Sequence, residues 1–354
     1  MKTKKFKKKF KRKDLRLKNI VIDDLESFSE TEIVEEKRAE KKILEKAKTS
    51  KKSGLKLKKG RILKVKTNYR CLVAFDDYEI ECPLSGRLKQ LNLETRSLVA
   101  TGDFVMVDFS EEPRIEEILP RKTKLTRFSE AGFQTEVIIA ANIDQVIITV
   151  SVAEPPLNLS LVDRYICAAA LENIIPIICI NKIDLADNLE EIEKQVAFYS
   201  RCGYKVVLTS VKTEKGLDEL KKVLKNKQSV FSGHSGVGKS SLINKLQPGI
   251  NLRTGEISEF NKKGIHVTTS SRLIPWKFGG FLVDTPGIKT FGLPRKEKDK
   301  IPRIFPGFSE LSENCKFQNC SHTHENECAV KDALARNEYP QERYFSYLRI
   351  WESL

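Results

Sequence analysis

The chain has 354 residues, of which 40% are hydrophobic and 31% are charged. This is the composition of a soluble protein, at a length that fits two or three domains. The longest apolar run, residues 137–153, contains Asn142, Asp144 and Gln145, which excludes a membrane span. The basic N-terminus has no apolar segment behind it, so we expect no secretory signal and a cytoplasmic protein.

The net charge of +15 is concentrated at the N-terminus, where residues 1–60 hold 22 Lys and Arg against 10 Asp and Glu. Residues 1–13 alone contain nine Lys and Arg and no acid, interrupted by Phe6 and Phe10. We predict a basic, largely disordered extension over residues 1–55, with one helix possible over residues 29–49. It is either an arm that neutralises phosphates of a nucleic acid or a solvated tail, and the sequence leaves both open.

Residues 56–122 are predicted to form a small β-barrel. Alternating apolar and polar residues indicate strands over 60–66, 70–75, 78–82, 104–109 and 115–119. Five short strands in so few residues favour an OB-fold, a barrel that commonly binds RNA. Other five-stranded barrels, including a purely structural one, fit the same pattern.

Residues 123–293 alternate between strands and helices and predict a doubly wound, parallel α/β domain. We expect strands over 144–150, 174–180, 204–208, 229–232 and 281–284. Helices are expected over 161–173, 189–202, 217–224 and 241–246.

The predicted strand at 229–232 leads into a match to the phosphate-binding loop G-x-x-x-x-G-K-S/T. Glycines allow backbone N–H groups to point at phosphate oxygens, and the following helix begins with its positive dipole end. Lys239 would reach the β- and γ-phosphates, and the Ser240 hydroxyl would bind Mg²⁺. The predicted nucleotide-binding residues here are Gly233, His234, Ser235, Gly236, Val237, Gly238, Lys239, Ser240 and Ser241.

A second motif, Asn181-Lys182-Ile183-Asp184, predicts that the base is guanine. The Asp184 carboxylate can accept hydrogen bonds from N1–H and the exocyclic amine of guanine, and adenine offers neither donor there. Asn181 would brace the loop, and the stem of Lys182 would cover the base. Ser210 lies in Thr209-Ser210-Val211-Lys212, which resembles the S-A-K motif that supports the base, with Val211 in place of the usual Ala.

Asp284-Thr285-Pro286-Gly287 fits D-x-x-G, in which Asp284 would hold Mg²⁺ through water and the Gly287 N–H would sense the γ-phosphate. A hydroxyl within residues 264–269 would complete the Mg²⁺ shell. The order of the motifs is permuted, because the guanine motif at 181 precedes the phosphate loop at 233. We therefore predict a circularly permuted GTPase domain that binds GTP and GDP with Mg²⁺.

The C-terminal residues 294–354 are predicted to be a mainly α-helical, zinc-binding domain. Cys315, Cys320, His322 and Cys328 supply three thiolates and one imidazole, a set that suits one closed, structural Zn²⁺ site. Spacing alone leaves His324 as an alternative to His322. Helices are expected over 329–336 and 341–352.

From about residue 58 onward the chain resembles the small ribosomal subunit biogenesis GTPases of the RsgA (YjeQ) family. The resemblance lies in the permuted motifs, the zinc pattern, Ala141-Asn142-Ile143-Asp144-Gln145, Asp163-Arg164-Tyr165 and the F-G-L at 291–293. It implies GTP hydrolysis stimulated by the small ribosomal subunit, contacts of barrel and zinc domain with rRNA, and a role late in subunit maturation. It also favours His322 over His324 as the zinc ligand, and it implies Thr268 as the Mg²⁺-shell threonine and His266 as a candidate for orienting the attacking water. A histidine that only packs or hydrogen-bonds within this loop is the alternative for His266.

Lys239, Thr268 and His266 are accordingly the predicted catalytic residues of a monomeric GTPase switch. No arginine finger is evident near the phosphate loop, so slow hydrolysis by the free protein is expected. The alternatives are an RNA-binding module with nucleotide as a structural ligand, and a permuted GTPase acting on the large subunit. The intact phosphate loop and Asp284 disfavour the first, and the barrel and zinc pattern disfavour the second.

Overall fold

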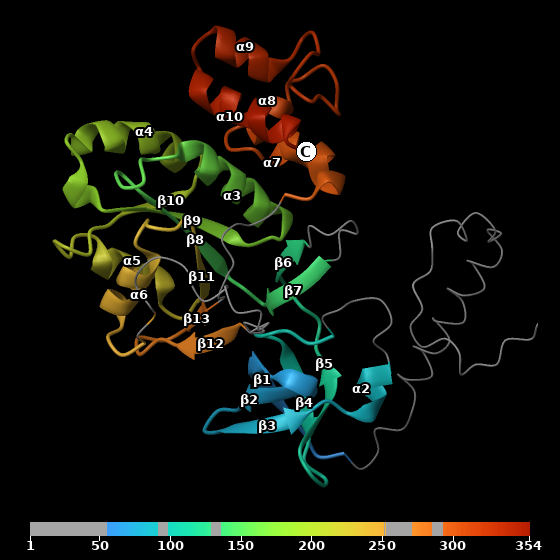
Figure 1. The fold of residues 1–354 in the computed structure, drawn as a ribbon. Helices are drawn as coiled ribbons and strands as arrows, with labels where there is room; N and C mark the ends of the chain where they lie inside the picture. The colour runs from blue at the N-terminus through green and yellow to red at the C-terminus, as the bar shows by residue number, and fades with distance from the viewer. Residues whose placement is uncertain (1–54, 91–97, 129–135, 251, 253–270, 285–292) are drawn as a thin grey trace, which may run out of the picture. The chain divides into compact units, whose positions relative to one another are not determined.

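The computed structural model describes residues 55–90, 98–128, 136–250, 252, 271–284 and 293–354. The chain divides into two compact units, Met1–Ser53 and Gly54–Leu354, and the first lies outside the described residues. The predictions of a basic arm and of a helix over residues 29–49 therefore stay predictions. Figure 1 shows the second unit, with its helices and strands labelled.

All five strands predicted for residues 56–122 are present. They are β1 (Leu57–Val65), β2 (Arg70–Ala74), β3 (Glu79–Pro83), β4 (Phe104–Asp108) and β5 (Arg114–Ile118), with the short 3-10 helix η2 (Thr67–Tyr69) and helix α2 (Gly86–Gln90) between them. Antiparallel pairing joins β3 to β2, β2 to β1, β1 to β4 and β4 to β5. A single bridge between Leu84 and Ile115 links the end of β3 to β5. Identification of this ring as an OB-fold stays a prediction.

The ring encloses its own apolar core, because alternate side chains of each strand point inward. Buried residues from all five strands meet there, among them Ile62, Val73, Cys82, Val105 and Ile115.

A parallel sheet with helices on both faces follows. Its strands are β8 (Gln145–Ser151), β9 (Ile175–Asn181), β10 (Lys205–Leu208), β11 (Gln228–Ser232) and β13 (Phe281–Asp284), in the order β10-β9-β8-β11-β13. The helices are α3 (Leu159–Leu171), α4 (Leu189–Arg201), α5 (Leu217–Leu224) and α6 (Lys239–Leu246), with the 3-10 helix η3 (Ile183–Leu185) after β9. Asn158 and Asn188 cap α3 and α4 with their side-chain oxygens.

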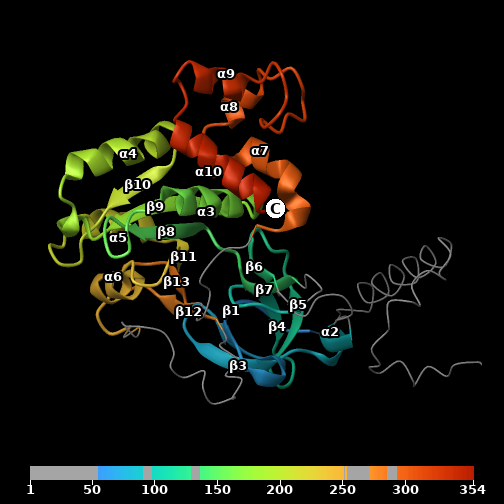
Figure 2. The same ribbon diagram turned by 45° about the horizontal axis from the view of Figure 1, so that its top comes forward.

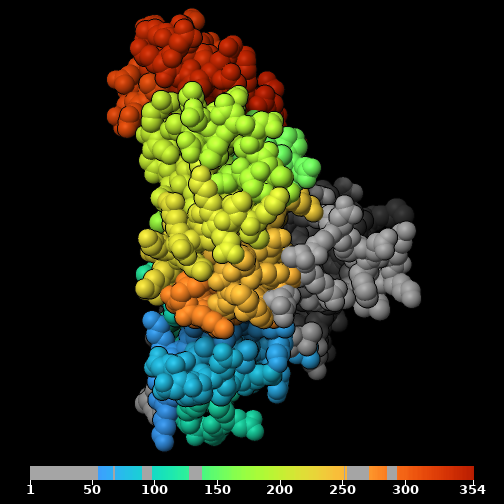
Figure 3. Space-filling model, turned by 90° about the vertical axis from the view of Figure 1, so that its left-hand side faces the viewer, coloured from blue at the N-terminus to red at the C-terminus, as the bar shows by residue number. Residues whose placement is uncertain are grey.

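Successive side chains of a strand point to opposite faces of the sheet and pack against different helices. In β8, Val146 and Ile148 pack in the core that includes residues of α3 and α4, and Ile147 packs in the core that includes residues of α5 and α6. Figure 2 shows α3 and α4 above the sheet and α5 and α6 on its other side. Figure 3 shows the outer surface of the layer that contains α5, in yellow.

The sheet is mixed rather than wholly parallel, which corrects the prediction. The strand β12 (Arg272–Pro275) runs antiparallel to β13 and pairs at Arg272 with Lys64 of β1. A reversed edge strand is common in doubly wound sheets. Here it joins the α/β sheet to the N-terminal strands in one eleven-stranded sheet. A separate hairpin of β6 (Lys124–Phe128) and β7 (Glu136–Ala141) precedes β8 and was not predicted.

The C-terminal part is helical among the residues described. It contains the 3-10 helix η5 (Arg295–Lys300), α7 (Ile301–Ile304), α8 (Ser309–Ser312), α9 (Ala329–Ala335) and α10 (Gln341–Glu352). Its aromatic core includes Phe305, Phe308 and Tyr347, whose rings lie 4.8–5.3 Å apart. The division into domains at residues 55, 122 and 293 stays a prediction.

The structure also shows the surroundings of the five cysteines that lie outside the zinc pattern. Cys71, Cys82, Cys167 and Cys179 are buried, and Cys202 is half-buried. Burial raises the pKa of Cys71 and Cys179 to about 12, which makes both thiols unreactive. Within the described ranges, no helix has the length and apolar character needed to cross a membrane.

Candidate guanine-nucleotide site and metal centre

The phosphate loop connects β11 to α6, as predicted. Gly233, Gly236 and Gly238 have φ of 147°, 83° and 92°, a region that favours glycine. A β-carbon on Gly233 would lie 2.0 Å from the Thr149 carbonyl oxygen, and one on Gly238 would lie 2.4 Å from Nδ2 of Asn181. The glycines are therefore required for the loop to pack against the ends of β8 and β9.

Lys239 folds back over the phosphate loop. Its Nζ donates to the carbonyl oxygens of Gly233 and His234, both at 2.7 Å. Burial lowers the pKa of Lys239, because desolvation disfavours the ammonium form. A bound phosphate would act as the counter-ion of this partly desolvated ammonium group.

The guanine motif and the phosphate loop are in direct contact. Asn181 is 1% exposed, and its Nδ2 donates to the carbonyl oxygen of Val237 at 2.9 Å. Its Oδ1 accepts from Oγ1 of Thr209 at 3.0 Å. The amide thus braces one loop against the other, which is the role expected of Asn181.

Asp184 and Ser210 lie together at the ends of neighbouring strands. The Ser210 hydroxyl donates to Oδ1 of Asp184, and Ser210 Oγ accepts from the N–H of Thr213 at 3.1 Å. Lys182 adopts a left-handed conformation with φ of 60°, and its Nζ donates to the Glu154 carbonyl oxygen. The structure therefore gathers the predicted guanine-binding side chains around one edge of the sheet.

Asp284 ends β13, which is hydrogen-bonded to β11 in parallel register. The carboxyl ends of adjacent parallel strands meet at the same edge, so Asp284 lies on the side of the phosphate loop. Ser240 and Ser241 begin α6 and are half-buried. His234, Ser235 and Gly236 are exposed. His266, Thr268 and Gly287 lie outside the described residues, so their predicted roles stay predictions.

The four predicted zinc ligands converge. One ligand atom from each of Cys315, Cys320, His322 and Cys328 lies within 4.8 Å of the others. Three thiols and one buried imidazole are a donor set typical of tetrahedral structural Zn²⁺ sites. His324 is exposed, and its Nδ1 contacts Oγ1 of Thr323 at 3.0 Å. The geometry thus favours His322 over His324.

The hydrogen bonds around His322 indicate which ring nitrogen faces the metal. Nδ1 lies 3.6 Å from Sγ of Cys315 and 3.4 Å from Sγ of Cys328. Nε2 lies 3.1 Å from Oγ of Ser312, whose own proton goes to the Phe308 carbonyl oxygen at 2.7 Å. Ser312 must then accept from Nε2–H, which leaves the Nδ1 lone pair free for a metal.

Helix α10 holds the zinc loop from outside. The hydroxyl of Tyr344 donates to the carbonyl oxygen of His322 at 2.8 Å, and that of Tyr347 donates to the carbonyl oxygen of Ser321. The same helix also contacts α3, where Arg349 donates to Oγ of Ser160 at 2.6 Å. Helix α10 therefore contacts both the metal loop and the α/β layer.

A buried ion pair on this contact was missed by sequence reasoning. Asp163 of α3 is 0% exposed, and its Oδ2 accepts from Nη1 of Arg343 at 2.7 Å. Its Oδ1 accepts from the hydroxyl of Tyr199 at 2.7 Å. In the sequence, Asp163 is recognised only as part of the family-like motif Asp163-Arg164-Tyr165, with no role assigned to it. Its partner Arg343 lies 180 residues later in the chain.

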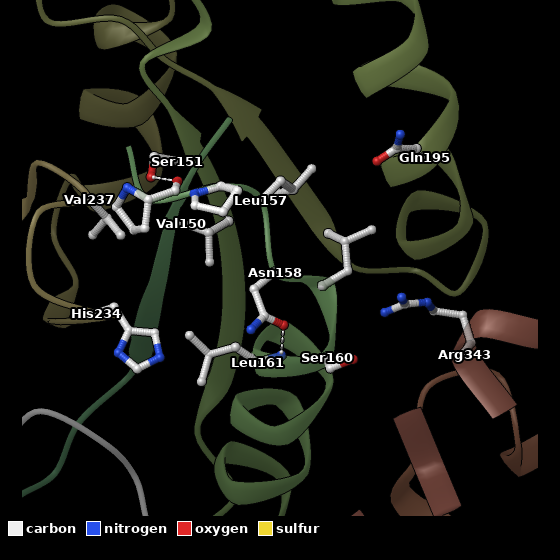
Figure 4. A pocket seen from close by; sticks show the side chains of 13 residues that line it. Val150, Ser151, Leu157, Asn158, Ser160, Leu161, Gln195, His234, Val237 and Arg343 are labelled. Atoms are coloured by element: carbon white, nitrogen blue, oxygen red, sulfur yellow. Dashed lines mark hydrogen bonds between the residues drawn. The ribbon is translucent and has the colours of Figure 1, made fainter. Parts of the chain in front are cut away.

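Arg343 also lines a cavity of about 490 Å³ beside the phosphate loop. Figure 4 shows His234 and Val237 of the loop on one side, Asn158 and Leu161 near the start of α3, and Arg343 on the other side. Because Arg343 of α10 and residues of the phosphate loop line the same cavity, α10 lies near the nucleotide site.

Comparison with known proteins agrees with this geometry. The profile of the RsgA GTPase family matches residues 118–294. The chain is 37% identical over 300 residues to the small ribosomal subunit biogenesis GTPase RsgA of Flavobacterium psychrophilum, covering 83% of this chain and 92% of that protein. It is 40% identical over 273 residues to the RsgA of Caldanaerobacter subterraneus, covering 77% and 87%.

Solved structures give the same result. The crystal structure of YjeQ from Thermotoga maritima has a TM-score of 0.69 and 32% identity, covering 84% of this chain and 98% of that one. The crystal structure of YloQ, a circularly permuted GTPase, has a TM-score of 0.66 and 28% identity, covering 86% and 97%. The resemblance noted from the sequence is thereby confirmed, and the chain belongs to the RsgA GTPase family.

Proposed function

We propose that the protein is a cytoplasmic, monomeric GTPase that binds the small ribosomal subunit and its rRNA and assists late maturation of that subunit. GTP hydrolysis to GDP and phosphate releases it, and the subunit stimulates this hydrolysis. The names of the relatives support the process and the partner. The observation that favours guanine-nucleotide chemistry is the brace from Asn181 to Val237, which joins the guanine motif to the phosphate loop.

Each described site residue has a role in this proposal. Asp184 reads the base, and Ser210 holds its carboxylate in place. Lys239 leaves the loop carbonyls for the β- and γ-phosphates, where its charge stabilises the transition state. Ser240 would supply a hydroxyl oxygen to Mg²⁺, and Asp284 would hold the ion through a water molecule. When bound, Mg²⁺ would neutralise phosphate charge.

His266, Thr268 and Gly287 complete the site in this proposal. Thr268 would bind Mg²⁺, the Gly287 N–H would sense the γ-phosphate, and His266 would orient the attacking water. Cys315, Cys320, His322 and Cys328 would hold one Zn²⁺ in a structural role, because four protein ligands would leave no open coordination position.

The N-terminal strands offer a surface suited to RNA. Tyr78 is 41% exposed, and its ring stacks on Phe75 with centroids 5.0 Å apart. The ammonium of Lys58 lies 4.8 Å from the Tyr78 ring and 5.3 Å from the Phe75 ring. The aromatic rings can stack on a base while the neighbouring Lys58 ammonium neutralises a phosphate, which supports an rRNA contact here.

GTP hydrolysis by the purified chain, with and without small ribosomal subunits, tests this function. Lys239→Ala is the blank, because it removes the phosphate-loop cation. We expect slow turnover alone, a large stimulation by subunits, and loss of both in the variant. Turnover that is fast alone or unaffected by subunits would contradict the proposal. An absence of hydrolysis with RNA binding intact would favour a nucleotide-stabilised RNA-binding module.

A further inference from the structure

Arg272 is placed where the nucleotide site meets the N-terminal strands. It begins β12 and lies opposite Asp284 in the antiparallel register of β12 and β13. Its Nε donates to Oδ2 of Asp284 at 3.1 Å. On the other side of β12, Arg272 pairs with Lys64 of β1. One residue thus contacts the D-x-x-G carboxylate through its side chain and the N-terminal strands through its backbone.

Hydrogen bonds hold the backbone next to Arg272 in place, so the guanidinium extends from a fixed backbone position. The Thr101 hydroxyl donates to the carbonyl oxygen of Ser271, the residue before Arg272, at 2.9 Å. The Ser271 hydroxyl donates to the carbonyl oxygen of Ile139 in β7 at 2.6 Å. Thr101 and Ser271 are both buried. The ion pair is therefore built on fixed backbone, although the Arg272 side chain itself is 47% exposed.

The Arg272 guanidinium and a Mg²⁺ ion would compete for the Asp284 carboxylate. The Asp284 side chain is 19% exposed, and its Oδ2 already accepts a hydrogen bond from Nε of Arg272. Two cations competing for one partly buried carboxylate repel each other, so binding of the divalent ion weakens the ion pair. Because the Arg272 side chain is half-exposed, the ion pair is weak enough to be displaced, with an effect of about two- to fivefold on an equilibrium constant.

We infer that Arg272 is the cation that Mg²⁺ displaces from Asp284 when GTP binds, an inference that rests on the proposed function of this site. Arg272 is then a positioning residue. It keeps the Asp284 carboxylate neutralised and oriented in the nucleotide-free chain, and it raises the Mg²⁺ concentration that nucleotide binding requires. Because its backbone pairs with β1, the Mg²⁺ requirement becomes sensitive to the N-terminal strands.

The test is a Mg²⁺ titration of binding of a fluorescent, non-hydrolysable GTP analogue to the full chain. Arg272→Gln removes the charge, and Arg272→Lys retains it. Arg336→Gln is the matched control, because Arg336 forms an exposed ion pair with Glu338 in the C-terminal part. We expect half-maximal binding of Arg272→Gln at about two- to fivefold lower Mg²⁺ than wild type. Arg272→Lys and Arg336→Gln should match wild type, and all four proteins should bind equally in excess chelator.

An unchanged Mg²⁺ requirement in Arg272→Gln would overturn the inference while leaving the proposed function in place. A higher requirement would also overturn it and would show that Arg272 assists the bound nucleotide. Failure of the wild-type chain to bind the guanine analogue at any Mg²⁺ concentration would overturn both. Thermal unfolding of the nucleotide-free variants, expected to match wild type within a few degrees, separates these results from misfolding.

Discussion

Nη1 of Arg343 in α10 lies 2.7 Å from Oδ2 of Asp163 in α3, and the carboxylate is fully buried. The same Nη1 lies 2.9 Å from the hydroxyl of Tyr199. This buried ion pair joins the helix that holds the zinc loop to the helix that follows β8, next to the cavity beside the phosphate loop.

Arg343→Met should lower the free energy of unfolding by about 3–5 kcal/mol, because it leaves the Asp163 carboxylate buried without its counter-charge. Arg349→Met is the matched control on the same helix, since Arg349 is exposed and its side chain donates to the hydroxyl of Ser160 on α3. We expect it to cost about 1 kcal/mol or less. Urea unfolding measures both, and equal losses would contradict the role given to Asp163.

The loss in Arg343→Met should depend on pH. Burial raises the pKa of Asp163, and Arg343 is the largest influence that opposes this rise. Without Arg343 the folded-state pKa rises further above the unfolded value of about 3.9. The folded variant then binds a proton more readily than the unfolded chain, so its deficit against wild type shrinks as pH falls. A deficit at pH 5 equal to or larger than that at pH 8 would count against this account.

His322→Ala should abolish tight Zn²⁺ binding, whereas His324→Ala should leave it unchanged, because only His322 faces the three thiols. Ser312→Ala removes one of the hydrogen-bond partners that orient the His322 ring and should weaken Zn²⁺ binding by about 10-fold. Competition with a chromogenic chelator measures all three variants. Loss of zinc in His324→Ala would refute the assignment.

Asp184→Asn should weaken GDP binding by about 100-fold, because it removes the acceptor for two donors of guanine. It should at the same time improve binding of xanthosine diphosphate, since an amide N–H can donate to the oxygen that replaces the exocyclic amine. Fluorescence titration with both nucleotides provides the comparison. Equal weakening for both would mean that Asp184 acts on the loop rather than on the base.

Gly238→Ala should abolish nucleotide binding, because the new β-carbon would lie 2.4 Å from the Asn181 amide that braces the phosphate loop. Gly203→Ala is the control, because Gly203 has a similar φ of 85° and a β-carbon there would have no atom of the described residues within 4 Å beyond its chain neighbours. The control should lose about 1 kcal/mol of stability through its backbone conformation and keep its nucleotide affinity. Retained binding in Gly238→Ala would show that the brace is dispensable.

Elements with a strong local pattern were predicted well from the sequence. The alternating strands β1 to β5 and the helices α3, α4, α5 and α10 appear within a few residues of their expected bounds. Strand β12 was missed because Arg272–Pro275 is four residues long and has no alternation to read. The hairpin β6–β7 was missed because the apolar residues of β7 run on toward β8.

In the candidate site, too, residues in local motifs could be predicted, whereas contacts that depend on tertiary structure could not. The phosphate loop, the guanine motif and the zinc ligands are local patterns that can be recognised in the sequence, and the roles assigned to their residues stay predictions. The partners of Arg272 and Arg343 depend on which strands and helices become neighbours, 12 and 180 residues apart. No local pattern carries that information, because each pair forms only when the tertiary structure does.

Binding to purified small ribosomal subunits, measured by co-sedimentation with a non-hydrolysable GTP analogue and with GDP, tests the central claim most directly. If the site at the ends of β9, β11 and β13 controls docking, the GTP analogue should give clearly tighter binding than GDP. Lys239→Ala should remove the difference. Equal binding with both nucleotides would contradict a nucleotide-controlled switch, whatever the rate of hydrolysis.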